Sequence, residues 1–322
     1  AGCSAAPEPT VAAVPAGPAV PAGPAGPAGS AGGFPRRVET ALGPVDIPAK
    51  PQRVVTLGRE AEVALALGVT PVGMPSSNYA DGVEPYLQER VAGQGVSVFT
   101  VADGIPFEQV AALAPDLILA GTYFGIEQQR ERLSAIAPVV TYRRGSYEDS
   151  WQEQATLIGE ALGEDERAAA VVAGLEERIA GIAAAHPSWQ GRTCTLSFNY
   201  EAGKITSIVD PADFALQLLA ELGLVLAPGV GDLPRRGGAG QADIGYEVVS
   251  RLDADVLLLA HVSPTVQAQL EELPVFAGVP AVRAGRYVPV DLITVSVLRA
   301  PMVLGIEYAL DQLVPPLEGA LG

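Results

Sequence analysis

The chain has 322 residues, of which 48% are hydrophobic, with 36 glycines and 28 prolines. This is long enough for two lobes with their own cores and favours a globular α/β protein with many turns. The formal net charge of −17 argues against a nucleic-acid backbone or an anionic membrane surface as the main partner.

The first 33 residues differ in composition from all that follow. They contain seven prolines, seven glycines, one acidic residue and no basic one, so we expect a semi-extended tether there. The small residues directly before Cys3 resemble the end of a bacterial lipoprotein signal, in which the cysteine carries the lipid. A tether would give such an anchored domain reach from the membrane.

From residue 34 onward, short apolar runs alternate with helical ones, which is typical of βα units around a parallel sheet. We expect strands at 53–57, 70–75 and 138–142, and a helix followed by a strand in "FEQVAALAPDLILA", residues 107–120. The pattern predicts an N-terminal α/β lobe over 34–145.

Residues 146–189 are predicted to be helical and to connect this lobe to a second one. Gly163 marks a break, and the Ala-rich segment 164–186 continues as one helix until Pro187. At about 1.5 Å per residue this helix spans roughly 34 Å, the width of a small domain. We therefore expect a rigid strut between two lobes.

The α/β pattern restarts in residues 190–322. Cys194 falls in a predicted strand core, and a closing helix is expected from 301 to about 314. Here "YEVVSRLDADVLLL", residues 246–259, repeats the pattern of the 107–120 segment. The predicted fold is therefore two Rossmann-like α/β lobes joined by a single long α-helix.

Five segments resemble a known family. They are "PQRVVTLGREAEVALALGVTPVG", "FEQVAALAPDLILA", "WQEQATLIGEALG", "LDADVLLLA" and "LPVFAGVPAVRAGRYVPVD". In this order the chain resembles the bacterial periplasmic binding proteins for iron-siderophore, haem and vitamin B12 import, the class whose lobes are joined by one rigid helix. The resemblance implies a monomeric component of an ABC importer that captures a ferric siderophore between its lobes. Such a protein would be periplasmic or lipid-anchored to the outer face of the cell membrane. Haem, cobalamin and a sensor role without transport remain alternatives.

The side chains available favour binding over catalysis. The chain has only two histidines, His186 and His261, and lacks a Ser/His/Asp order, a Cys/His pair, an HExxH motif and a phosphate-binding loop. A site for a bare metal would need about three or four converging ligands. We therefore expect neither an enzyme nor a resident metal or cofactor, but a ligand that brings its iron already chelated.

Ligands of open α/β sheets lie beyond the carboxyl ends of the strands. Arginine forks suit carboxylate, catecholate or hydroxamate oxygens, and aromatic rings suit planar chelators or a cationic chelate. For haem, a tyrosine or His261 is a possible axial ligand. The predicted ligand-binding residues are Arg59, Tyr123, Phe124, Tyr142, Arg143, Arg144, Asn199, Tyr200, Arg235, Arg236 and His261.

The two repeated segments place Glu108 and Glu247 at the same step of each unit. A glutamate in the first turn of a helix complements the helix dipole, worth about 0.3 to 1 kcal/mol. In the family that this chain resembles, one exposed glutamate on each lobe docks onto arginines of the membrane permease. The resemblance implies that role for Glu108 and Glu247.

Overall fold

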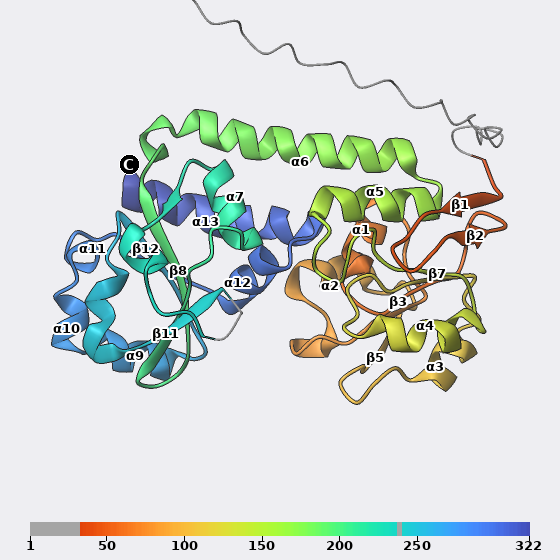
Figure 1. The fold of residues 1–322 in the computed structure, drawn as a ribbon, viewed down its shortest axis with the longest axis horizontal. Helices are drawn as coiled ribbons and strands as arrows, with labels where there is room; N and C mark the ends of the chain where they lie inside the picture. The colour runs from red at the N-terminus through yellow and green to blue at the C-terminus, as the bar shows by residue number, and fades with distance from the viewer. Residues whose placement is uncertain (1–32, 237–239) are drawn as a thin grey trace, which may run out of the picture.

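The computed structural model describes residues 33–236 and 240–322. Two α/β lobes lie side by side, and helix α6, Asp165–Ala185, runs along one side of both (Figure 1). This architecture confirms the predicted fold class. The predicted tether, apart from Gly33, and Cys3 lie outside the described residues.

The N-terminal lobe is built on a five-stranded parallel sheet in the order β5-β4-β3-β6-β7. All residues of β3 and β6 are buried, as expected for a parallel sheet that is covered on both faces. A hairpin, β1 (Arg36–Val38) and β2 (Val45–Ile47), precedes this sheet. The strands are β3 (Val54–Thr56), β4 (Gly73–Pro75), β5 (Ser97–Phe99), β6 (Leu117–Leu119) and β7 (Val139–Val140). The helices are α1 (Glu60–Ala66), η1 (Ala80–Gly82), α2 (Pro85–Val91), α3 (Phe107–Ala112) and α4 (Ile126–Ser134).

Two helices connect the lobes. Helix α5, Trp151–Leu162, begins at Ser150, which forms a capping box with Glu153. It ends at Gly163, whose φ of 71° is a left-handed conformation that favours glycine. Helix α6 follows and is succeeded by a short 3-10 turn, η2, Pro187–Trp189. It occupies the segment where the sequence predicts the strut.

The C-terminal lobe contains a mixed sheet in the order β11-β9-β8-β12-β13, with β10 also paired to β8. Strand β9 is antiparallel to both β8 and β11, so β11 and β8 run in the same direction. The strands are β8 (Thr193–Glu201), β9 (Lys204–Ile208), β10 (Val225–Leu226), β11 (Gln241–Gly245), β12 (Val256–His261) and β13 (Tyr287–Val290). The helices are α7 (Phe214–Glu221), α8 (Pro228–Gly231), η3 (Tyr246–Leu252), α9 (Pro264–Glu271), α10 (Pro274–Ala277), α11 (Pro280–Arg283) and α12 (Leu292–Arg299).

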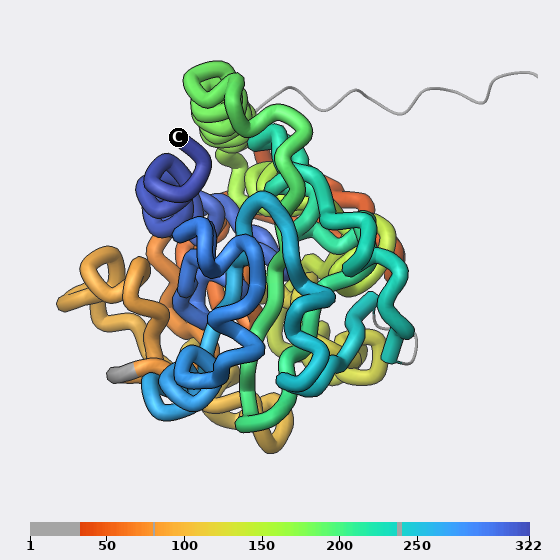
Figure 2. The backbone as a smooth tube through the Cα atoms, turned by 90° about the vertical axis from the view of Figure 1, so that its left-hand side faces the viewer, coloured from red at the N-terminus to blue at the C-terminus, as the bar shows by residue number. Residues whose placement is uncertain are grey.

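The last helix, α13, Val303–Leu321, is longer than expected and contacts both lobes. It continues past Pro315 and Pro316, because Leu313 and Leu317 on either side are fully buried and hold it in place. Leu304 packs in an apolar cluster of the N-terminal lobe. Figure 2, seen from the C-terminal lobe, shows the chain end close beneath α6. Because α13 of the C-terminal lobe also packs on the N-terminal lobe, the division of the chain into domains at 34–145, 146–189 and 190–322 stays a proposal.

Candidate ligand-binding cleft

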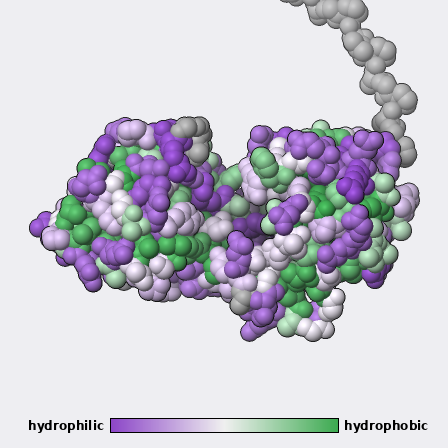
Figure 3. Space-filling model, turned by 90° about the horizontal axis from the view of Figure 1, so that it is seen from below, coloured by the Kyte–Doolittle hydropathy of each residue, from purple (hydrophilic) through white to green (hydrophobic). Residues whose placement is uncertain are grey.

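Three adjoining cavities line the space between the lobes, where the surface is hollowed (Figure 3). Their volumes are about 480, 510 and 200 Å³. Tyr147 lines the first and second cavities, and Tyr200 and Arg299 line the second and third. The cavities thus form one continuous cleft with walls from both lobes.

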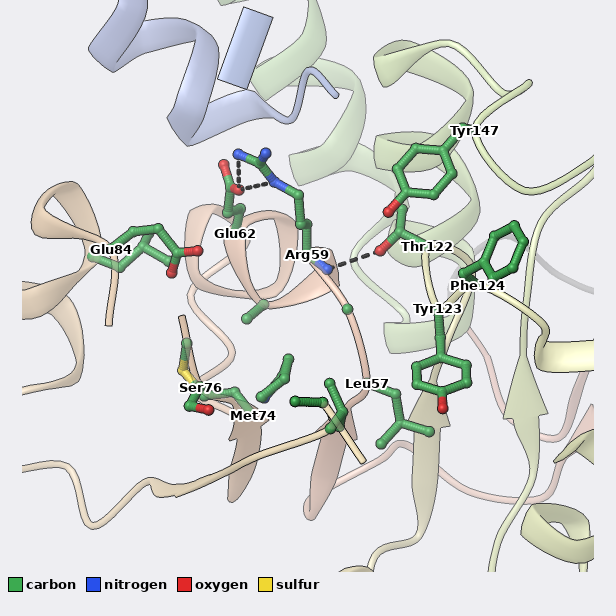
Figure 4. A pocket seen from close by; sticks show the side chains of 16 residues that line it. Leu57, Arg59, Glu62, Met74, Ser76, Glu84, Thr122, Tyr123, Phe124 and Tyr147 are labelled. Atoms are coloured by element: carbon green, nitrogen blue, oxygen red, sulfur yellow. Dashed lines mark hydrogen bonds and ion pairs between the residues drawn. The ribbon is translucent and has the colours of Figure 1, made fainter. Parts of the chain in front are cut away.

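Arg59 lies between β3 and α1 and contributes to the first cavity. Its guanidinium forms an ion pair with Glu62 at 2.9 Å (Figure 4). It also donates to the Tyr86 hydroxyl at 3.0 Å. Burial alone would lower the pKa of Arg59, but Glu62 and then Tyr86 outweigh it, so this pKa is raised. Arg59 is therefore a fixed cation in the wall of the cleft.

Glu62 connects this wall to the last helix. Its side chain is 2% exposed, and its Oε2 accepts a hydrogen bond from the Gly305 amide of α13 at 2.8 Å. A Cβ at Gly305 would lie 2.9 Å from that oxygen, so this close approach requires glycine. The floor of the cleft therefore joins α1 to α13.

Glu60 fixes two loops at the carboxyl edge of the N-terminal sheet. Its buried carboxylate accepts from the Thr122 amide at 2.5 Å, the Thr122 hydroxyl at 2.8 Å and the Gly58 amide at 2.9 Å. Burial raises the pKa of Glu60 despite these hydrogen bonds. The loop that follows β6 is thereby held where Tyr123 and Phe124 enter the cavity.

Six aromatic side chains line the cleft: Tyr123, Phe124, Tyr147, Phe198, Tyr200 and Phe214. Phe124 is 87% exposed and Tyr200 57%. In Figure 4 the rings of Tyr123, Phe124 and Tyr147 gather on one side of the first cavity. Tyr147 has a φ of 61°, which is rare for a bulky residue and costs on the order of 1–3 kcal/mol. Exposed rings held in this way provide apolar faces for a ligand.

The wall from the C-terminal lobe carries several charged side chains. Arg299, at the end of α12, lies 3.4 Å from Asp213, and Arg236 lies 3.1 Å from Asp243. Lys204 forms an ion pair with Glu201 of the same β8-β9 hairpin. Three cations thus surround the third cavity.

The structure brings five of the predicted ligand-binding residues to the cleft. These are Arg59, Tyr123, Phe124, Tyr200 and Arg236. Direct contact of these five residues with a ligand stays a prediction.

The other predicted residues do not line these cavities. Tyr142 is buried and donates to Glu127; burial and this hydrogen bond raise its pKa to about 12. Asn199 is buried with its amide 2.7 Å from the Tyr246 hydroxyl. His261 Nε2 is hydrogen-bonded to the Tyr287 hydroxyl at 2.8 Å, and burial lowers the pKa of His261. The arginines are ion-paired as follows: Arg143 with Glu160, Arg144 with Glu153 and Arg235 with Asp210.

Nine charged or aromatic residues that line the cleft were missed from the sequence. They are Glu62, Glu84, Tyr147, Phe198, Glu201, Lys204, Asp213, Phe214 and Arg299. Tyr147 and Asp213 follow strands β7 and β9, so a longer search beyond strand ends would have included them. Glu62 and Arg299 lie within helices, and no strand-end rule would find them.

The chain matches the model of a protein family, described as periplasmic binding protein, over residues 54–291. The chain belongs to this family, which confirms the resemblance seen in the sequence. The family consists of substrate-binding proteins. No helix among the described residues is long and apolar enough to span a membrane.

Three similar proteins agree with this assignment. The probable siderophore-binding lipoprotein YfiY of Bacillus subtilis is 34% identical over 150 residues, which cover 46% of this chain and 44% of that protein. The achromobactin-binding periplasmic protein of Dickeya dadantii is 28% identical over 82% of this chain and 85% of its own length. A solved periplasmic solute binding protein from Mycobacterium smegmatis is 28% identical, with a TM-score of 0.77 over 89% of this chain and 98% of that chain.

Proposed function

We propose that this periplasmic binding protein is the extracytoplasmic component of an ABC importer that captures a ferric siderophore between its lobes and delivers it to a membrane permease. The observation that carries the proposal is the continuous cleft, lined by exposed aromatic rings and charged side chains from both lobes. The names of two relatives, one siderophore-binding and one achromobactin-binding, support this ligand class.

The residues of the cleft suit the organic shell of a chelate. A siderophore occupies the coordination sphere of its iron, so the protein contacts chelator atoms. Tyr123, Phe124, Tyr147 and Tyr200 offer ring faces, and Arg236 and Arg299 offer donors to chelate oxygens. Among the residues that the structure describes, no three His, Cys, Asp or Glu side chains are grouped to hold a metal ion.

The connections between the lobes favour a small closing motion. Helix α6 bridges the lobes along one side, and α13 contacts both. Helical connectors of this kind restrict hinge motion compared with two flexible strands. Small-angle scattering should therefore show nearly the same radius of gyration with and without ligand; a large decrease would contradict the rigid connection.

Glu108 and Glu247 are the proposed contacts with the permease. Glu108 is exposed in the first turn of α3, which follows strand β5. Glu247 is exposed just after β11, which runs in the direction of β8. Each glutamate therefore follows the edge strand of its own sheet, and this equivalent, exposed position in the two lobes supports the proposal.

Lipid attachment at Cys3 is a further part of the proposal. The name of the Bacillus relative, a lipoprotein, supports it. Expression in a bacterium followed by mass spectrometry of the N-terminal peptide tests it. A Cys3 peptide without lipid would count against an anchor at this residue.

Calorimetric titration of the purified chain against ferric siderophores, haem and cobalamin tests the ligand class. We expect at least one ferric siderophore to bind with micromolar or better affinity, and haem and cobalamin to bind more weakly. Preference for haem or cobalamin would change the ligand class, while binding of none of the three would leave a sensor role as the better account.

A further inference from the structure

The charged side chains that line the cleft balance one another. Four are cationic and four are anionic. The cations are Arg59, Lys204, Arg236 and Arg299, and the anions are Glu62, Glu84, Glu201 and Asp213. The lining as a whole therefore offers a ligand no net charge.

The wall from the N-terminal lobe is the acidic one. Its first cavity is lined by Arg59, Glu62 and Glu84, and the first two are already paired with each other. Glu84 is half-buried and takes part in none of the ion pairs found within residues 33–236 and 240–322. Burial raises the pKa of Glu84, and the nearby Glu62 carboxylate adds to the effect. In Figure 4 Glu84 lies across the cavity from the aromatic rings.

The wall from the C-terminal lobe has the opposite sign. The third cavity is lined by Lys204, Arg236 and Arg299 but by only one acid, Glu201. The side chains of Arg236 and Arg299 are 56% and 34% exposed, and each is paired with one carboxylate, Asp243 and Asp213 respectively. Gln241, which also lines this cavity, lies within hydrogen-bond reach of both guanidinium groups. The two walls therefore differ in charge across the space that a ligand would fill.

Resting on the proposed function, we infer that the siderophore is a ferric chelate of near-zero net charge, bound in one orientation. Its anionic oxygens face Arg236 and Arg299, and its electropositive or hydrogen-donating edge faces Glu84. A highly anionic chelate would lose its hydration on entering the cleft, and this cost would not be offset because the lining carries no net positive charge. The chain's formal charge of −17 would also oppose its approach.

Hydroxamate chelates fit this description best. An iron trihydroxamate is uncharged at its core, and its exterior consists of amides and methylene chains, which lose little on transfer to a cleft lined by aromatic rings. A triscatecholate carries three negative charges on the same iron. The structure thus favours the first chemistry over the second.

The test compares three ferric chelates by calorimetry at low ionic strength. Ferrichrome is uncharged, ferrioxamine B carries one free ammonium group, and ferric enterobactin is a trianion. We expect either hydroxamate to bind at least about tenfold more tightly than ferric enterobactin. If ferric enterobactin bound most tightly, this inference would fall while the proposed function survived; if no ferric siderophore bound, both would fall.

Two substitutions test the orientation. Glu84→Gln should weaken the binding of ferrioxamine B by about tenfold and change the affinity for ferrichrome by no more than a factor of about three. Arg236→Gln should weaken the binding of both hydroxamate chelates. Glu89→Gln and Arg283→Gln, which remove exposed charges of the same kind outside the cavities, are the controls. Equal effects of Glu84→Gln on ferrichrome and ferrioxamine B would overturn the assigned orientation.

Discussion

Replacement of Glu62 by glutamine removes the charge that holds the floor of the cleft together. The buried carboxylate binds Arg59 at 2.9 Å, Tyr86 at 3.0 Å and the Gly305 amide at 2.8 Å. Glutamine is nearly isosteric, so the packing volume stays constant while the arginine loses its counter-charge. The variant therefore measures the electrostatic part of this contact.

The expected loss follows from the burial of the two partners. Removing one member of a buried ion pair costs about 3–5 kcal/mol, since the other charge is left uncompensated. The Arg59 side chain is 19% exposed, and glutamine keeps an oxygen that can accept from Gly305. We therefore expect the lower end of this range, about 3 kcal/mol, and a fall in melting temperature of about 6 °C.

Urea unfolding followed by circular dichroism gives the free energy of unfolding. Glu166→Gln, an exposed glutamate in the first turn of α6, is the control and should change it by no more than about 0.5 kcal/mol. Adding Arg59→Met to Glu62→Gln should recover part of the loss, because the unpaired cation is then absent. A loss for Glu62→Gln no larger than that of the control would refute this account.

Three further predictions concern the rim of the cleft, the strut and the docking surface. Tyr147→Ala should weaken siderophore binding by about tenfold or more with a nearly unchanged melting temperature, since the ring is 45% exposed and spans two cavities; unchanged affinity in a titration would contradict this. Hydrogen bonding to a backbone carbonyl, and then to Glu318, raises the pKa of His186. This stabilisation is present at low pH and is lost as pH rises through the raised pKa. The native protein should therefore have a higher free energy of unfolding than His186→Gln at about pH 6, and this difference should shrink by about pH 8. A difference that stays constant with pH would rule the effect out. Reversal of both charges, Glu108→Arg with Glu247→Arg, should abolish uptake into cells while ligand affinity and melting stay normal, and the docking proposal fails if uptake persists or the fold is lost.

Long elements with clear end signals could be predicted from the sequence. Gly163 and Pro187 bracket the segment that forms α6, Asp165–Ala185. By contrast, β1, β2 and β5 were not predicted, because each has three residues of which at least one is polar or charged. Strands β3 and β6 are equally short but fully buried, so their apolar runs are visible in the sequence. The segment after β11 is a kinked 3-10 helix, because Val248 has a non-helical φ of −115°. Its likeness to α3 in sequence therefore did not extend to an α-helix.

The cleft was harder to predict because ion-pair partners come from distant parts of the chain. Arg143 and Arg144 follow a strand end as expected, yet they pair with Glu160 and Glu153 on α5. Nothing local distinguishes them from Arg59, which lies in the wall of the first cavity. Strand-end position therefore identified the region, and the fold of the surrounding helices decided which side chains reach it.

The contact of α13 with the first lobe has a consequence for biosynthesis. Leu304 completes the apolar cluster of Ala61, Leu65, Met74, Val83 and Leu87, and the Gly305 amide satisfies Glu62. A nascent chain that has just finished its first sheet still lacks these partners and leaves the α1 surface open to water. The N-terminal half therefore cannot reach its final stability during synthesis or export, but must wait for the last twenty or so residues to emerge.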